Sequence, residues 1–158
     1  MTSVLSPLIE KIFYGGAFTA YSVGMSLFLG YALTRREQLA LVGKWTLEGA
    51  VGMHVVSLLI RTFIGRQMPQ HDWYVPWSNW FESFSFFAAV IATEYLIIQR
   101  GRTVPILGAF VTPLVFLVML VAIHSPFGMQ IPMLVPALQS HWMAFHVPVM
   151  FIAMRPSP

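Results

Sequence analysis

Five histidines stand in a chain without cysteine, so imidazole is the strongest soft-metal or haem-iron ligand that the sequence offers. His54 falls in the middle of an apolar run, where an unpaired imidazole is unfavourable. It has to meet either a ligand or a hydrogen-bonding partner such as Ser57, a threonine or a freed backbone carbonyl. Because one histidine does not make a site, the residue types favour the hydrogen-bonded alternative and keep His54 as a candidate cofactor-binding residue.

A second candidate ligand lies near the C-terminal end of the chain. His141 and His146 are five positions apart, about 140° around a helix, so a regular helix cannot aim both at one iron. His146 has Trp142 at i−4 on the same face, and this pair suits a flat conjugated ring edged by an imidazole. The alternative is an ordinary interfacial anchor, a common role of such residues at the end of a membrane helix. We take His146 as the candidate axial ligand of a haem iron and Trp142 as a candidate contact of the ring.

The stretch 75–83, VPWSNWFES, has an unusual mixture of polar and aromatic residues. It places Asn79, Glu82 and Ser83 on one side of an expected helix start. Helix physics explains this without a ligand, since Ser78 can cap the helix and an acid in the first turn suits the macrodipole. The aromatic density exceeds what membrane anchoring requires, so Asn79 and Glu82 remain candidate cofactor contacts.

The elements that position these side chains have to be membrane helices. With 57% hydrophobic and 9% charged residues, the chain is neither a soluble globular protein nor an intrinsically disordered one. Five apolar runs have close to the ~20 residues that a helix needs to cross a bilayer, and none alternates like a barrel strand. The runs are 12–34, 46–64, 79–98, 104–124 and 138–154. We expect an all-α polytopic bundle of about five transmembrane helices, forming a single domain over residues 1–158.

The basic residues predict the orientation of this bundle. Six of the nine lysines and arginines flank the runs on one side, namely Arg35, Arg36, Lys44, Arg100, Arg102 and Arg155. The positive-inside rule therefore places the N-terminus outside and the C-terminus inside. The same residues form small clusters rather than one basic face, so no nucleic-acid partner is expected. Solute transport is disfavoured because no line of polar residues crosses all five runs.

Three stretches, in this order along the chain, form a further pattern. They are His54-x6-Arg61, then Pro76-x-Ser78-Asn79-x-x-Glu82-Ser83, and then Pro136-Ala137-Leu138-x-Ser140-x-Trp142-x-x-x-His146-Val147. The pattern resembles that of the CcsA-type cytochrome c biogenesis proteins, the haem-handling membrane subunits of the thiol-dependent cytochrome c synthase. In the second stretch Phe81 stands where tyrosine is usual in the family. The resemblance implies that His146 corresponds to an external histidine that is an axial haem ligand, whereas His141 falls at a variable position.

The resemblance spans roughly residues 50–153 and covers only the front of the family's pattern. The chain lacks the family's tryptophan-rich loop, Trp-Gly-x-x-Trp-x-Trp-Asp, and the helices that carry two more histidines. We therefore expect either the front half of a split synthase or a shortened relative with a changed task. As an enzyme the chain would be at most part of a split cytochrome c synthase, a haem lyase, because it lacks the full site.

The resemblance implies a membrane protein that presents haem b at the exported face for attachment to apocytochrome c. The expected partners are a second membrane subunit that supplies the missing haem-binding half, apocytochrome c, and lipid. The expected location is a bacterial inner membrane or a thylakoid membrane. The alternative is a truncated, non-catalytic structural membrane subunit of a larger respiratory or photosynthetic complex.

Overall fold

The structure is a computed structural model, and it describes residues 2–67, 74, 77, 79–101, 104–126, 129, 146, 149 and 150. Four long helices account for most of them: α1 (Thr2–Thr34), α2 (Glu37–Arg66), α3 (Trp80–Gly101) and α4 (Pro105–Ile123). Each helix is long and apolar enough to cross a membrane, and no strand occurs in the described ranges. The predicted all-α membrane fold class is confirmed.

The fifth apolar run, 138–154, lies outside the described residues except for His146, Val149 and Met150. The count of five spans and the orientation of the bundle therefore stay predictions. The third and fourth runs agree with α3 and α4 to within three residues at each end.

The first two helices begin earlier than the apolar runs indicated. α1 begins at Thr2 instead of residue 12, and α2 begins at Glu37 instead of residue 46. An apolar run marks the part of a helix that lipid covers, whereas backbone hydrogen bonding continues into polar flanks. At the start of α2, Glu37 lies in the first turn, where a carboxylate suits the positive end of the macrodipole. The longer α1 brings Glu10 into the helix.

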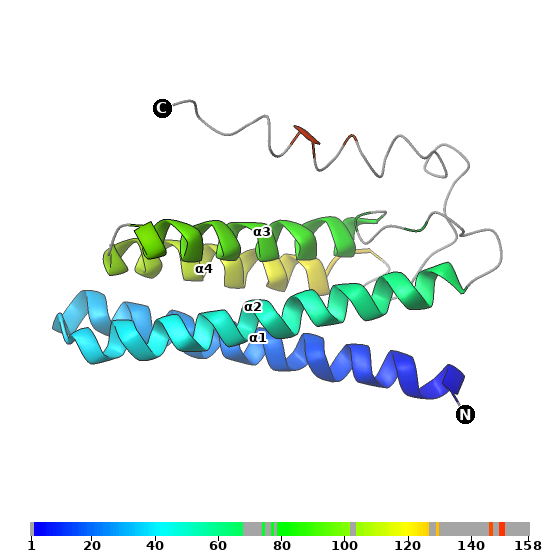
Figure 1. Ribbon diagram of the computed structural model, residues 1–158, viewed down its shortest axis with the longest axis horizontal. Coiled ribbons are helices and arrows are strands. Elements are labelled where there is room, and N and C mark those ends of the chain that lie inside the picture. The colour runs from blue at the N-terminus through cyan, green and yellow to red at the C-terminus, as the bar shows by residue number, and fades with distance from the viewer. Residues whose placement is uncertain are drawn as a thin grey trace.

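The helices form two antiparallel pairs that lie against each other (Figure 1). The long pair is α1 with α2, and the shorter pair is α3 with α4. α1 packs extensively on both α2 and α4, whereas the contact between α2 and α3 is smaller. The N-terminus, the end of α2 and the start of α3 meet at one end of the bundle (Figure 1). Polar residues far apart in the sequence therefore come together at that end.

A tight turn closes the long pair. Arg35 has a φ of 56°, in the left-handed region, and its backbone N–H donates to Tyr31 O at 2.7 Å. This is the geometry of an αL helix end, which satisfies one of the last carbonyls of α1. The chain can then turn back within two residues and begin α2 at Glu37.

Aromatic side chains are buried along α1, and small side chains are buried along α3. Tyr14, Ala17, Tyr21 and Phe28 follow one face of α1 and are all buried. On α3, small buried residues lie opposite the larger side chains and let the helices approach closely; they are Ala88, Ala89 and Ala92.

The outer surface of the bundle is apolar. It exposes large hydrophobic side chains from all four helices, among them Leu33, Trp45, Ile97 and Phe110. A surface of this composition fits lipid rather than water as the surrounding solvent. This agrees with the membrane fold class, and it means that a buried polar group in this protein has no water at hand in the bilayer core.

Candidate functional site

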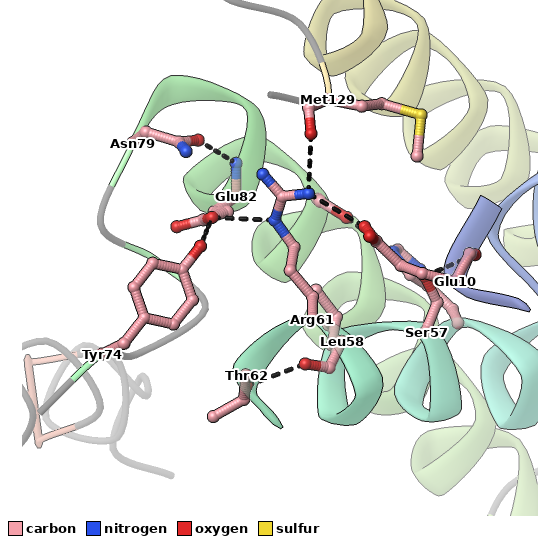
Figure 2. A network of polar contacts seen from close by, with 11 residues as sticks. Glu10, Ser57, Leu58, Arg61, Thr62, Tyr74, Asn79, Glu82 and Met129 are labelled. Carbon is pink, nitrogen blue, oxygen red and sulfur yellow. Dashed lines mark hydrogen bonds and ion pairs between the residues drawn. The ribbon is translucent and has the colours of Figure 1, made fainter. Parts of the chain in front are cut away.

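Arg61 lies at the centre of a buried ion-pair network at the end of α2 (Figure 2). Its Nη1 donates to Glu10 Oε1 at 2.9 Å, and its Nε donates to Glu82 Oε1 at 2.8 Å. These distances are typical of charge-assisted hydrogen bonds. The three residues are 1%, 5% and 0% exposed, in the order Arg61, Glu10, Glu82. One guanidinium thus joins α1, α2 and α3.

Groups outside the three helices complete the network. The Tyr74 hydroxyl donates to Glu82 Oε1, and Arg61 Nη1 also donates to the Met129 carbonyl at 2.9 Å (Figure 2). The guanidinium carbon of Arg61 lies 4.8 Å from the centre of the Phe81 ring, a cation–π distance. The network therefore links Tyr74, which precedes α3, and Met129, which follows α4, to the three helices.

The Tyr74 ring needs a glycine beneath it. It packs directly on Gly65 of α2, where an added Cβ would overlap the ring. Tyr74 is 1% exposed, so the ring has no open space to move into without disturbing its neighbours. Gly65 thus lets the connecting segment lie close enough to α2 for the Tyr74 hydroxyl to reach Glu82.

Asn79 caps α3. Its Oδ1 accepts a hydrogen bond from the Glu82 backbone N–H at 2.9 Å, which is the usual bond of a helix cap. Asn79 thus performs the capping that we expected of Ser78, a residue outside the described part of the chain. Asn79 Nδ2 is buried and has no hydrogen-bond partner among the described residues. Glu82 is fixed both by its own backbone and by its carboxylate.

His54 forms a second buried network, two helical turns along α2 from Arg61. Its Nε2 lies 2.7 Å from Ser85 Oγ, and its Nδ1 lies 3.3 Å from Tyr21 Oη. The Tyr14 and Tyr21 rings meet the imidazole edge-on, with centroids 5.7 and 5.8 Å away. The imidazole is 0% exposed. Both ring nitrogens therefore have partners from neighbouring helices.

The hydroxyl that binds His54 is different from the one expected from the sequence. Ser57 Oγ donates to the backbone carbonyl of Glu10 at 3.3 Å and not to His54. Ser57 is less than one turn along the same helix from His54, so the two side chains leave α2 in different directions. Hydroxyls from α1 and α3 fill the role instead.

The surroundings of His54 do not fit an axial haem ligand in this arrangement. A ligating imidazole needs one nitrogen free to face the metal, and both nitrogens of His54 are engaged. Within the described ranges, no group of three or more histidine, aspartate or glutamate side chains could hold a metal ion. The two buried networks therefore act as polar contacts between helices.

An apolar groove lies beside these networks, between α2 and α3. It has a volume of about 360 Å³, and its lining includes Leu58, Trp77, Phe86 and Glu94. No described histidine lines it. The groove can take an apolar guest, but the described side chains offer that guest no imidazole.

Of the five predicted site residues, Asn79 and Glu82 lie together in the structure. His54 and Glu82 are buried and Asn79 is half-buried. Asn79 and Glu82 lie at the start of α3, whereas His54 lies near the middle of α2. His146 is helical and exposed, so its imidazole is accessible. Trp142 lies outside the described residues. Asn79 and Glu82 contact each other and Glu82 contacts Arg61, whereas His54 belongs to the separate network.

Four residues of the two networks were missed by sequence reasoning: Glu10, Tyr21, Tyr74 and Ser85. Glu10 was overlooked because it precedes the first apolar run. A signal for it does exist, since Glu10 shares a helix face with Tyr14 and Tyr21 at spacings of 4 and 11. A search for polar residues at helical spacing along all faces would have found Glu10.

Known proteins with similar sequences were compared with the chain. Residues 77–155 match the family described as "Cytochrome C assembly protein". The chain is 30% identical over 151 residues to the cytochrome c biogenesis protein CcsA of Trichodesmium erythraeum, an alignment covering 94% of this chain and 40% of that protein. It is 35% identical over 107 residues to CcsA of Trichormus variabilis, covering 66% of this chain and 30% of the relative.

A third relative is CcsA of a Synechocystis species, which is 34% identical over 112 residues, 69% of this chain and 33% of that protein. The chain thus spans between 30% and 40% of the length of these curated relatives. No solved structure matches it.

Proposed function

The chain belongs to the cytochrome c assembly protein family, and on that premise we propose that it is a membrane haem-handling protein of cytochrome c biogenesis. In this proposal it presents haem b at the exported face for attachment to apocytochrome c. The observation that supports it most is the 2.8 Å ion pair between Arg61 and Glu82. This pair joins two of the three stretches whose pattern resembles the CcsA-type proteins.

His146 is the proposed axial ligand. Its side chain is exposed, in contrast to His54, whose two nitrogens are already engaged. Trp142, four residues earlier in the sequence, is the proposed contact of the ring. Bound haem would supply the vinyl groups that react with the thiols of apocytochrome c, while the protein supplies orientation.

The Arg61 network has a positioning role in this proposal. By joining Glu10 and Glu82, Arg61 holds the ends of three helices at fixed distances. Asn79 fixes the start of α3, and its Nδ2 is available to donate a hydrogen bond to a bound carboxylate. His54 is assigned to the contact between helices rather than to the iron. These side chains hold the exported end of the bundle in one arrangement.

A second membrane subunit completes the site in this proposal. It would supply the second axial ligand and the tryptophan-rich loop found in the CcsA-type pattern. We propose that the Arg61 end of the bundle faces the exported side; the position of Arg35, Arg36 and Arg100 at the other end supports this under the positive-inside rule. The membrane is a bacterial plasma membrane or a thylakoid membrane.

Spectroscopy of the complex isolated with its native partners in mild detergent tests the function. We expect haem absorbance that His146→Ala abolishes, together with a loss of cytochrome c maturation in cells. His124→Ala is the matched control, since His124 is also exposed and, among the described residues, its one side-chain hydrogen bond is to the Leu120 carbonyl. A haem-free complex together with normal maturation in His146→Ala would refute the proposal. Co-purification of such a complex with electron-transport subunits would support the structural alternative.

A further inference from the structure

A crevice of about 430 Å³ lies at the opposite end of the bundle from Arg61. It is formed by the first turns of α2 and by the region where α3 ends and α4 begins. The side chains that matter for its chemistry are Glu37, Leu41, Lys44 and Gln99, and Pro105 marks the start of α4 at its edge. Because it lies where membrane-spanning helices end, the crevice is at the depth of lipid headgroups.

Gln99 brings a polar group without a partner into this crevice. It is 7% exposed, and its Oε1 is buried and accepts no hydrogen bond within the described part of the chain. A buried acceptor without a donor destabilises the folded state, because it has lost its hydrogen bonds to water. A ligand with a hydroxyl or amine donor would relieve that loss.

Lys44 lines the crevice with a cationic side chain that has no carboxylate partner among the described residues. It is half-buried, and none of the ion pairs among the described residues involves it. Glu37 lies two turns earlier on α2 but is exposed and forms no such pair with Lys44. A half-buried ammonium with no carboxylate in contact favours a bound anion.

The start of α4 adds to the positive potential. Val104 makes no side-chain cap hydrogen bond, and Pro105 occupies the first turn of this 19-residue helix. The N-terminal end of a helix carries partial positive charge and favours phosphate. Arg36 and Arg100 adjoin two crevice residues, Glu37 and Gln99, in the sequence and are both exposed. Arg100 Nη2 lies 3.9 Å from Glu48 Oε1, which offsets part of its charge, whereas none of the ion pairs among the described residues involves Arg36. The local field therefore favours an anionic group over a neutral one.

We propose that the crevice binds the phosphate of an anionic phospholipid whose headgroup also carries a hydroxyl, as that of phosphatidylglycerol does. Lys44 pairs with the phosphate, and the headgroup hydroxyl donates to Gln99 Oε1. Leu41, which is exposed on α2, lies in position to contact the acyl chains. Inorganic phosphate offers the same anion but neither the carbon-borne hydroxyl nor the acyl chains, so it should bind more weakly.

Native mass spectrometry of the full chain in detergent tests this site. The probes are phosphatidylglycerol, phosphatidylethanolamine, phosphatidylcholine and inorganic phosphate. We expect phosphatidylglycerol to bind with a dissociation constant at least about tenfold lower than those of the other three probes. Equal binding of phosphatidylglycerol and phosphatidylcholine would overturn the proposal. If phosphatidylethanolamine bound as tightly as phosphatidylglycerol, the assignment of the headgroup hydroxyl would be overturned. If inorganic phosphate bound as tightly as phosphatidylglycerol, the assignment to a lipid would be overturned.

Substitutions of crevice residues test whether the lipid binds in the crevice. Lys44→Gln and Gln99→Leu should each weaken phosphatidylglycerol binding by about tenfold, whereas Lys44→Arg should retain it. Lys11→Gln is the matched control, because Lys11 is exposed at the opposite end of the bundle and should not affect binding. Gln99→Leu removes the unsatisfied acceptor, so the lipid-free variant should fold at least as stably as the parent chain. Unchanged lipid binding in Lys44→Gln would overturn the proposal.

Discussion

Replacing Arg61 by methionine would remove the cation that bridges two buried carboxylates. Glu10 and Glu82 accept its hydrogen bonds at 2.9 and 2.8 Å, and they are 5% and 0% exposed. Removing one member of a buried ion pair is destabilising by about 3–5 kcal/mol, because the remaining charge is left in a medium of low polarity. We expect the Arg61→Met variant to lose about this much unfolding free energy.

The loss should stay near that of one pair, although two ion pairs are broken. Tyr74 still donates to Glu82, and the contributions of residues in one network do not simply add. A loss of about 3–5 kcal/mol raises the unfolding equilibrium constant by roughly 10²- to 10⁴-fold, in favour of the unfolded state. The Glu10→Gln variant should lose only about 1–2 kcal/mol, because the amide oxygen still accepts from Arg61 and the Glu82 pair remains.

Titration with SDS in mixed micelles, followed by the helical circular dichroism signal, measures these losses. Arg66→Met is the matched control, because Arg66 is exposed near the end of the same helix. Its one described side-chain bond, to the Tyr74 carbonyl, is 3.4 Å long, and its removal should change the unfolding free energy by less than about 1 kcal/mol. The Arg61→Met loss should therefore exceed the control loss severalfold.

A triple variant separates lost charge balance from lost packing. Glu10→Leu, Arg61→Met and Glu82→Leu together replace the network by apolar side chains, which is often close to neutral for stability. We expect this variant to recover most of the loss seen in Arg61→Met alone. If the single variant were as stable as the Arg66→Met control, or if the triple variant were the least stable of the set, our account of Arg61 would be refuted.

The same titration tests three further residues. Gly108→Ala places a methyl carbon 2.6 Å from the Tyr95 hydroxyl oxygen and should lower the unfolding free energy by about 1–3 kcal/mol. Gly49→Ala is its control, because the added methyl meets nothing within 4 Å and should cause no loss. Equal effects of the two substitutions would contradict this packing. Ser85→Ala removes the hydroxyl 2.7 Å from His54 Nε2 and should lose about 1–3 kcal/mol, and an unchanged midpoint would contradict the hydrogen-bonded role of His54. Arg35→Gly should keep or gain stability, up to about 1 kcal/mol, because φ is 56° there, and a marked loss would contradict the left-handed turn.

The membrane fold class was predictable because apolar run length reports directly on bilayer thickness. The beginning of α2 was not, since Glu37 stands in a polar flank where hydropathy carries no information on backbone hydrogen bonding. The sequence also favoured hydrogen bonds over a ligand for His54, and the structure supplies them. The partners in these hydrogen bonds could not be named in advance, because Ser85 and Tyr21 reach His54 only through the packing of three helices.

The candidate site was predictable only in part. The motif pattern drew attention to Arg61, Asn79 and Glu82 but gave no reason for their spacing. The structure supplies one, since Asn79 caps the helix that carries Glu82, and Glu82 meets Arg61. Glu10 lies outside the motifs and completes the network. Its contact with Arg61 depends on how α1 packs against α2.

The contact between Glu10 and Arg61 has a consequence for how the chain enters the bilayer during synthesis. Both residues belong to the α1–α2 hairpin, which emerges from the ribosome before any part of α3. The arginine can thus be neutralised by an acid already synthesised, so the translocon can release the hairpin without an exposed charge. Glu82 then arrives with α3 and finds its cation in place, which couples the docking of the later helices to the correct insertion of the first two.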